Sequence, residues 1–316
     1  MTTALVVGVS GQDGSLLSKF LLEKGSRVIG ASRDPFASSM KNLETLSITS
    51  DIELVTMVPE DISSVFAVVQ RYQPDEIYFL SGQSSVGLSF TLPLETINSF
   101  VQSTLSILEV CRQVNPKIRQ YHAGSSECFG DIREGAAAED YPFNPMSPYA
   151  VGKASAYWLV KNYRAAYGLH ASTGILFNHE STLRPERYVT QKIVRSALAI
   201  SEGRQDRLEL GRLDIRRDWG WAPEYVEAMW KITQQNDASD YVVATGKSHT
   251  LQQFVEVVFQ EVGLDWNEHV VVSERHMRPA DIQHSCGDAS SIKRYLDWEA
   301  VTTMPQVARN MVNGVL

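Results

Sequence analysis

Residues 4–14, ALVVGVSGQDG, join a short apolar run to a glycine-rich turn, and this stretch decides the fold. The run ALVV is typical of a buried parallel strand. After the turn, Leu16, Phe20 and Leu21 recur at helical spacing, and Gly25 ends that helix. Strand, glycine turn and helix in this order are the setting for dinucleotide binding, so we expect a phosphate site at the helix N-terminus.

The three glycines of the turn have separate tasks. Gly8 permits the tight turn, Gly11 lets the backbone approach a pyrophosphate, and Gly14 lets the helix pack on the strand. Their spacing is G-x-x-G-x-x-G rather than G-x-G-x-x-G. A lone glycine triad is a weak signal, so the prediction depends on the strand and the helix that flank it.

The end of the second predicted strand, residues 27–31, bears on the choice of cofactor. An NAD site often has a carboxylate there, but this chain has Ser32 and Arg33. An arginine suits a 2′-phosphate and favours NADP, whereas the neighbouring Asp34 would repel that phosphate. NAD therefore stays open as the alternative, and Arg33 is equally well explained as a solvated loop cation.

Strand and helix alternate from residue 4 to residue 177, which predicts an α/β fold with a doubly wound parallel (Rossmann) sheet. We assign residues 1–177 to a dinucleotide-binding domain. Residues 178–316 are expected to form mainly a smaller α+β substrate-binding lobe, with segments around 212–235 returning to the first domain. Within that lobe, residues 178–181 and 216–219 are interpreted as a loop and a turn, and residues 241–243 as a short strand.

Composition excludes several classes of protein. The net charge is −8 and no basic run appears, which argues against nucleic-acid binding. No apolar run approaches the length that spans a membrane. Cys111, Cys128 and Cys286 form an odd set without metal-ligand spacing, so we expect no metal site and free thiols in a reducing cytoplasm.

A tyrosine and a lysine one helical turn apart form the central candidate for catalysis. Ser147 and Pro148 predict a helix start, and Tyr149 and Lys153 then share a helix face. A free tyrosine has a pKa of about 10, and a nearby ammonium stabilises its phenolate, so this pair can move a proton near neutral pH. The alternative is an exposed Tyr/Lys pair on a surface helix.

Polar residues also follow other predicted strands. Ser125, Ser126 and Glu127 come after the strand at residues 120–124, at an edge where chemistry is expected in open α/β sheets. A turn-and-cap role is the alternative for these three residues. Asp61 is either a partner for an adenine amino group or the cap of the helix that follows it.

The motifs together resemble those of the extended short-chain dehydrogenase/reductases, and among them those of the GDP-mannose 4,6-dehydratases. GVSGQDGS at residues 8–15 is similar to that family's cofactor loop. Other matches are QPDE at 73–76, SPYAV at 147–151, FNHES at 177–181, RDWG at 217–220 and RP at 278–279. They cover nearly the whole chain in order, and FNHES and RDWG lie outside the shared cofactor machinery.

The resemblance implies a role for each matching residue. Tyr149 would take the proton of the sugar 4-hydroxyl, supported by Lys153, and Glu127 would be the acid/base at C5 and at the C6 oxygen. Ser125 stands where the family has a threonine that hydrogen-bonds the 4-oxygen. The implied product is GDP-4-keto-6-deoxy-mannose, formed from GDP-mannose through transient hydride transfer to a bound NADP.

The resemblance also implies two binding sets and an assembly. The cofactor set is Gly8, Ser10, Gly11, Gln12, Asp13, Gly14, Arg33, Asp61, Ile62, Leu80, Gln83, Tyr149 and Lys153. The substrate set is Ser84, Ser85, Ser126, Asn178, Glu180, Val189, Lys192, Arg217 and Arg278, of which Asn178 and the three cations would contact the nucleotide diphosphate. The partners implied are a GDP-sugar substrate and a second copy of the chain, as a homodimer or homotetramer.

Departures from the family pattern leave other functions open. Ser125 replaces the threonine, and residues 124–127 and 146–149 also resemble the GDP-4-keto-6-deoxy-sugar 4-reductases, which consume NADPH and remove no water. A related nucleotide-sugar epimerase or dehydratase is a further alternative. A nucleotide sensor without turnover is a different class, and the presence of Glu127, Tyr149 and Lys153 argues against it.

Overall fold

A computed structural model describes residues 1–36, 40–277 and 279–316, so the predicted ligand Arg278 lies outside the described residues. The chain forms two compact units. The first unit comprises Met1–Cys128, Ser147–Leu176 and Val226–Tyr241, and the second unit comprises Phe129–Met146, Phe177–Tyr225 and Val242–Leu316. The sequence did not predict that residues 129–146 would group with the second unit. The functional division into a cofactor half and a substrate half stays a prediction.

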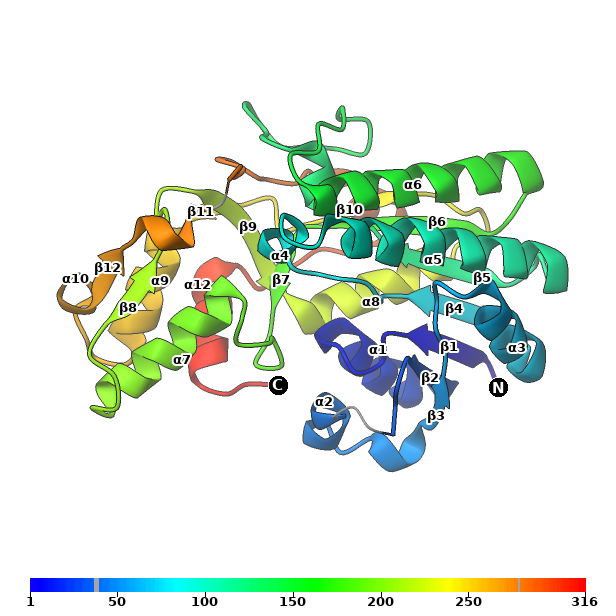
Figure 1. Cartoon of the computed structure of the whole chain (residues 1–316), viewed down its shortest axis with the longest axis horizontal. Coiled ribbons are helices and arrows are strands. Elements are labelled where there is room, and N and C mark those ends of the chain that lie inside the picture. Colours follow the sequence, from blue (N-terminus) through cyan, green and yellow to red (C-terminus); the bar gives the residue numbers. More distant parts are fainter. Residues whose placement is uncertain (37–39, 278) are drawn as a thin grey trace. The chain divides into compact units, whose positions relative to one another are not determined.

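A seven-stranded sheet organises the first unit, in the order β10-β6-β5-β4-β1-β2-β3 (Figure 1). The pairs from β6 to β3 are all parallel, which confirms the doubly wound sheet predicted from the alternating elements. The strands are β1 (Thr3–Val7), β2 (Arg27–Ser32), β3 (Glu53–Thr56), β4 (Glu76–Phe79), β5 (Arg119–Ala123), β6 (Ala171–Leu176) and β10 (Tyr241–Val243). The sequence placed residues 241–243 in the smaller lobe, whereas they extend the main sheet beside β6.

Helices cover both faces of this sheet. On one face α3, α5 and α6 pack in succession, and on the other α1 meets α8 through Phe20 and Trp230, whose ring centroids are 5.8 Å apart (Figure 1). The helices are α1 (Gln12–Glu23), α2 (Lys41–Thr45), α3 (Ile62–Tyr72), α4 (Val86–Ser89), α5 (Pro93–Val114), α6 (Pro148–Tyr167) and α8 (Ala222–Thr233), with 3-10 turns η1 (Thr49–Asp51) and η2 (Ser126–Phe129). Apolar side chains such as Leu5, Ile29 and Ile77 fill the space between sheet and helices.

The strand order reverses at β1, because β2 and β3 lie to one side of it and β4 to the other. The carboxyl ends of β1 and β4 meet there: the backbone N–H of Leu80 donates to the carbonyl of Val7 at 3.0 Å. Open α/β sheets bind ligands at such a switch point. The glycine loop therefore lies where the topology alone would place a nucleotide.

The second unit contains two small sheets and five helices among its described residues. One sheet has the order β11-β9-β7, and the other pairs β12 with β8. Its strands are β7 (Asn178–Glu180), β8 (Leu208–Leu210), β9 (Arg216–Trp221), β11 (Ser248–Thr250) and β12 (Val270–Val272). Its helices are α7 (Val189–Ser201), α9 (Leu251–Glu261), α10 (Trp266–His269), α11 (Ser290–Leu296) and α12 (Met304–Val312), with a 3-10 turn η3 (Glu274–His276).

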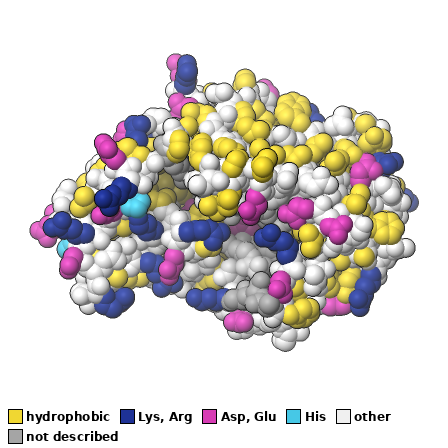
Figure 2. Space-filling view, viewed as in Figure 1, with side chains coloured by type: hydrophobic (Ala, Val, Ile, Leu, Met, Phe, Trp, Pro, Cys, Tyr) yellow, Lys and Arg dark blue, Asp and Glu magenta, His cyan; other side chains and the backbone are white. Residues whose placement is uncertain are grey.

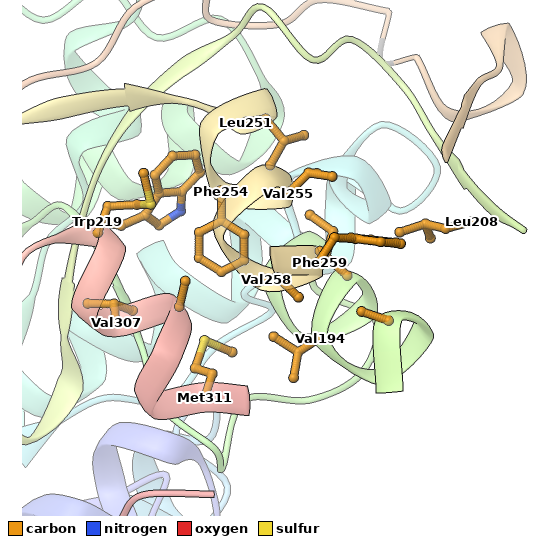
Figure 3. Packing of buried hydrophobic residues seen from close by; sticks show 14 of the residues in the cluster. Val194, Leu208, Trp219, Leu251, Phe254, Val255, Val258, Phe259, Val307 and Met311 are labelled. Carbon is orange, nitrogen blue, oxygen red and sulfur yellow. The ribbon is translucent and has the colours of Figure 1, made fainter. Parts of the chain in front are cut away.

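Two interpretations of this unit were wrong, since residues 178–181 and 216–219 were taken as a loop and a turn. Residues 178–180 form β7 and residues 216–219 belong to β9, and the two strands pair in parallel from Asn178 opposite Trp219 to Glu180 opposite Trp221. Charged residues are usually taken as a sign of an exposed turn. Here Glu180, Arg217 and Asp218 have hydrogen-bond partners inside the unit, so they lie on strands. Beside them, Figure 3 shows side chains of α7, α9 and α12 converging on Phe254 and Trp219 in a common apolar core.

Candidate active site

The turn after β1 has the shape that a nucleotide phosphate needs. Gly8 has a φ of +94°, a conformation that side chains disfavour. A Cβ on Gly14 would lie 2.2 Å from the carbonyl oxygen of Gly8, so only glycine lets α1 begin so close to the strand. Gly11 is the N-cap of α1 and contributes no side-chain cap, which leaves the first backbone N–H groups of the helix directed at the loop. This glycine cradle fits a dinucleotide pyrophosphate.

Neighbouring side chains hold the loop in place. Asn42 donates its side-chain amide to the carbonyl of Ser10 at 3.1 Å. The amide of Gln12 donates to the carboxylate of Asp13 at 2.9 Å, and Gln12 is buried. The loop is therefore preorganised, with a carboxylate in the first turn of α1 that suits the positive end of the helix dipole.

Candidates for the adenosine half of a cofactor lie at the ends of β2 and β3. Arg33 and Asp34 follow β2 and are both exposed. Asp61 caps α3, accepting the backbone N–H of Ser63 at 2.9 Å, and Ile62 begins that helix with 43% of its surface exposed. The cap found here is one of the two roles that the sequence left open for Asp61. The neighbouring Ile62 is exposed, so it presents an apolar surface on which an adenine ring can pack.

The segment after β4 is held together by Gln83. Its side-chain amide donates to the carbonyl of Ser85 at 2.9 Å and to the hydroxyl of Thr96 at 3.1 Å. Ser85 in turn caps α4, accepting the backbone N–H of Leu88 at 3.3 Å. Gln83 and Ser85 thus shape the loop through internal hydrogen bonds. Ser84 between them is exposed, and its contact with substrate stays a prediction.

Helix α6 carries the tyrosine and the lysine. Ser147 caps it by accepting the backbone N–H of Ala150 at 3.1 Å, and Pro148 occupies its first turn, as the sequence predicted. Tyr149 and Lys153 are each only 9% exposed. The ammonium of Lys153 donates to the carbonyl of Ala123, at the end of β5, at 2.8 Å. The exposed surface pair considered as an alternative is therefore excluded.

Burial has a direct effect on the lysine. It lowers the pKa of Lys153 to about 8, while Cys128 and the charge of Asp13 act in the opposite direction. Burial also raises the pKa of Cys128 to about 12, so this thiol is not a reactive thiolate near neutral pH. Lys153 keeps its proton through neutral pH and stays available as a cation beside Tyr149.

The turn after β5 brings Ser125 and Glu127 to the same place. Ser125 is 8% exposed, and its hydroxyl accepts the backbone N–H of Glu127 at 3.3 Å. The Lys153 contact with Ala123 ties this turn to α6. Cys128, whose pKa responds to both Lys153 and Glu127, donates weakly to the carbonyl of Ala150 at 3.8 Å. Four predicted catalytic residues, Ser125, Glu127, Tyr149 and Lys153, thus lie on two segments in contact within the first unit.

Several predicted substrate residues of the second unit have hydrogen-bond partners within that unit. Glu180 is 2% exposed, accepts the hydroxyl of Thr190 at 2.7 Å and forms an ion pair with Arg184 at 3.2 Å. This bond places Glu180 beside the start of α7, where Val189 is the first residue. Glu180 therefore has a structural role, because it connects Thr190 and Arg184. Its predicted contact with substrate stays a prediction.

Arg217 also has internal partners. Its guanidinium donates to the carbonyl of Ile282 at 2.8 Å and to the carboxylate of Asp281 at 3.0 Å. Lys192 is half-buried and donates to the carbonyl of Glu209 at 2.7 Å. Asn178 lies on the strand beside the one that carries Arg217. Asn178 is paired with Trp219, two residues after Arg217 on β9.

Sequence reasoning missed Phe100, which contacts both Tyr149 and Lys153. The buried face of α5 includes Phe100, Ser103, Thr104, Ile107, Leu108 and Cys111. Small polar residues such as Ser99 and Ser103, which are also buried on this helix, were the available signal for close packing.

Within residues 1–36, 40–277 and 279–316, no cluster of three or more His, Cys, Asp and Glu side chains is arranged to hold a metal ion. In the same part of the chain, no helix is both long and apolar enough to cross a membrane.

Comparison with known proteins adds independent information. A profile of the family described as GDP-mannose 4,6 dehydratase matches residues 5–311. GDP-mannose 4,6 dehydratase 1 of Arabidopsis thaliana is 41% identical over 320 residues, which cover 98% of this chain and 88% of the plant protein.

Solved structures show the same fold at low sequence identity. A dTDP-glucose 4,6-dehydratase from Bacillus anthracis, in complex with NAD, superposes with a TM-score of 0.86 at 19% identity, covering 99% of this chain and 96% of that one. RMD from Pseudomonas aeruginosa, complexed with NADPH, gives a TM-score of 0.81 at 20% identity, covering 99% and 98%.

Proposed function

The chain belongs to the GDP-mannose 4,6-dehydratase family, and we propose that the residues gathered at the ends of β1, β4 and β5 carry out this family's reaction. The reaction is a nucleotide-sugar 4,6-dehydration, which makes the protein a hydro-lyase. One observation supports the assignment most strongly. Tyr149, Lys153, Ser125 and Glu127 lie on two segments joined by the bond from Lys153 to Ala123.

The cofactor is a nicotinamide dinucleotide, whose pyrophosphate fits the glycine cradle of Gly8, Gly11 and Gly14. When bound, this group would supply the redox chemistry, in which the hydride that leaves C4 of the sugar is returned at C6. The chain's own residues must then handle the protons. Because the hydride is returned, no external reductant is consumed.

Oxidation at C4 needs a base for the 4-hydroxyl proton, and Tyr149 would take that proton. The Lys153 ammonium favours the phenolate, because an opposite charge nearby lowers the pKa of a tyrosine. Ser125, buried on the turn after β5, would donate its hydroxyl hydrogen to the 4-oxygen. A ketone at C4 then makes the neighbouring C5 hydrogen acidic.

Elimination across C5 and C6 needs a second acid/base, and we assign this to Glu127. Its carboxylate would remove the C5 proton and then donate a proton to the departing C6 hydroxyl. Ser125 accepts the backbone N–H of Glu127, so one turn presents both side chains. The two residues would act on neighbouring carbons of the same sugar.

Binding of the nucleotide diphosphate is assigned to the second unit. Lys192 and Arg217 are described cations there, and Arg278 is proposed with them from the family motif alone. The carbonyl of Ile282 and the carboxylate of Asp281 fix the orientation of the Arg217 guanidinium. A fixed guanidinium can bind a phosphate with little further loss of side-chain entropy.

NADP is the proposed form of the cofactor, because Arg33 follows β2 where an NAD enzyme usually has an acid. We expect NADP to be released when the purified protein is denatured. In a titration, Arg33→Ala is expected to weaken NADP binding about tenfold or more while leaving NAD binding unchanged, since only NADP has a 2′-phosphate. Release of NAD alone would show that Asp34 decides the preference.

The 4-reductase is retained as the second candidate because Ser125 replaces the family's threonine. The two reactions differ in product mass and in the use of reductant. Incubation with GDP-mannose and no added NADPH should give a product lighter by one water. Absence of that product, together with NADPH consumption on a 4-keto sugar, would support the reductase instead.

A second copy of the chain is the proposed partner, and we place its contact on α5 and α6. Figure 2 shows hydrophobic side chains gathered over these helices. Leu94 is 78% exposed, Trp158 is 56% exposed and Val151 is 42% exposed. Contiguous apolar side chains of this kind usually mark an interface.

If α5 and α6 form the dimer contact, Trp158→Glu should yield a monomer in analytical ultracentrifugation, because a buried carboxylate without a partner opposes association. Tyr295→Glu, which alters a 65% exposed residue on α11, is the matched control and should leave the assembly unchanged. A Trp158→Glu protein with the oligomeric mass of the native protein would refute this contact.

The cytoplasm is the proposed compartment, and the buried free thiols of Cys111, Cys128 and Cys286 support it.

A further inference from the structure

Phe100 on α5 lies beneath both members of the tyrosine–lysine pair. The Lys153 nitrogen lies over its ring, 4.4 Å from the centroid. The ring of Tyr149 meets it edge-on, with centroids 5.3 Å apart and an interplanar angle of 90°. Phe100 is only 2% exposed, so both contacts lie in a dry environment.

Two glycines make room for this ring. A Cβ on Gly82, whose φ is +139°, would lie 2.3 Å from the ring of Phe100. A Cβ on Gly152, on α6 between Tyr149 and Lys153, would lie 3.0 Å from it. The ring is therefore packed between the loop after β4 and the helix that carries the pair, with little freedom to move.

We propose that Phe100 is a positioning residue for the dehydration: its aromatic face binds the Lys153 ammonium in the protonated form and fixes the ring of Tyr149 beside it. The proposal rests on the assigned reaction only for its effect on turnover. The effect on the charge of Lys153 follows from the contacts alone.

The physical reason is the cost of burying an ammonium. Lys153 has three N–H donors, and one of them is given to the carbonyl of Ala123. A ring face attracts a cation through its quadrupole, more strongly where water is excluded. Phe100 thus offsets part of the effect of burial, which lowers the pKa of Lys153. A neutral lysine would no longer stabilise the Tyr149 phenolate.

Other groups face Lys153 and must be separated from the effect of the ring. Asp13 on α1 and Cys128 in η2 act on its charge, and Tyr149 lies on the same helix. His122 on β5 also responds to Lys153, and burial lowers its pKa to about 3. His122 and Cys128 therefore do not change charge near neutral pH. A test must vary the ring alone and leave these groups in place.

Stepwise fluorination of the Phe100 ring provides that test. Replacing Phe100 by mono-, di- and trifluorophenylalanine withdraws electron density from the ring face while nearly conserving its size. The pKa of Lys153 is read by NMR of lysine labelled with ¹³C at Cε, with the signal assigned through Lys153→Arg. We expect that pKa to fall with each fluorine, by about one pH unit in total.

The kinetic consequence has a defined sign. Lysine is active as the cation, so a lower pKa means that the proton is lost at lower pH. The alkaline limb of the kcat profile should move to lower pH by the same amount in each variant, with the acid limb unmoved. Phe100→Leu, which keeps apolar bulk but has no ring face, should show the full shift.

Fluorination of Phe254 is the matched control, because this residue is also fully buried and lies 5.5 Å from the ring of Trp219 in the second unit. It should leave the pKa of Lys153 unchanged. A constant Lys153 pKa across the Phe100 series, or an equal shift in the Phe254 series, would overturn the proposal. If the NMR shift appears while no dehydration is found in any variant, Phe100 still sets the charge of Lys153 and only the assigned reaction fails.

Discussion

Tyr149→Phe is expected to lower kcat for dehydration by about 10²–10⁴-fold, the usual contribution of a general base, while the protein retains its cofactor. The substitution removes only the hydroxyl group that accepts the 4-hydroxyl proton. The ring that contacts Phe100 is conserved, and Ser147 and Pro148 still begin α6. Loss of turnover without loss of folding therefore isolates the proton transfer.

Tyr157→Phe is the matched control for that measurement. Tyr157 lies on the same helix and is 5% exposed, against 9% for Tyr149, so its hydroxyl is removed from a comparable environment. Steady-state kinetics and the absorbance of bound nicotinamide should show a native-like control. An effect of less than about tenfold in Tyr149→Phe, or the same loss in both variants, would contradict the role of Tyr149.

Glu127→Gln is expected to bind cofactor and substrate but to stop water elimination. An amide has the shape of the carboxylate yet can neither take the C5 proton nor donate to the C6 oxygen. With GDP-mannose deuterated at C5, the native enzyme should remove the label from C5, whereas the variant should leave it in place. Mass spectrometry and NMR of the recovered sugar measure both outcomes.

Glu134→Gln is the control, because Glu134 is an exposed carboxylate seven residues further along the chain. It should behave as the native enzyme does. If Glu127→Gln forms the 4-keto-6-deoxy sugar at a near-native rate, Glu127 is not the acid/base. Because that product itself requires water elimination, the dehydratase assignment would stand and another group would have to be the acid/base.

Much of the first unit was predictable because its signals are local. A strand, a glycine turn and a helix are encoded within residues 4–25, and Gly14 has a single explanation in the close approach to Gly8. Ser147 and Pro148 likewise predict the start of α6, because the cap and the proline are next to each other in the sequence. Parallel strands buried on both faces are continuous apolar runs, which are easily recognised.

The second unit was harder because its polar residues are satisfied by distant partners. Asp218 is fully buried and accepts the backbone N–H groups of Thr245 at 3.0 Å and Gly246 at 2.9 Å. Its neighbour Trp219 packs against Phe254 in the core. No local pattern reveals such pairings, so a buried strand appeared to be a charged turn.

The same limit applies to Arg217 and Phe100. The motif predicted that Arg217 meets a phosphate, and that role stays a prediction, but no local pattern revealed its structural partner Asp281, 64 residues away along the chain. Phe100 and Lys153 are likewise brought together only by the packing of α5 on α6. Residues of two family motifs also have structural partners: in FNHES, Glu180 accepts the hydroxyl of Thr190, and in RDWG, Arg217 donates to Asp281.

Transfer of a label from C4 to C6 of the sugar tests the central claim most directly. GDP-mannose deuterated at C4 is incubated with the purified protein, without added reductant, and the product is analysed by mass spectrometry and NMR. The assigned reaction predicts a product lighter by one water in which the deuterium from C4 is bound to C6. A product without water loss, or a 4-keto-6-deoxy sugar with no deuterium at C6, would contradict it.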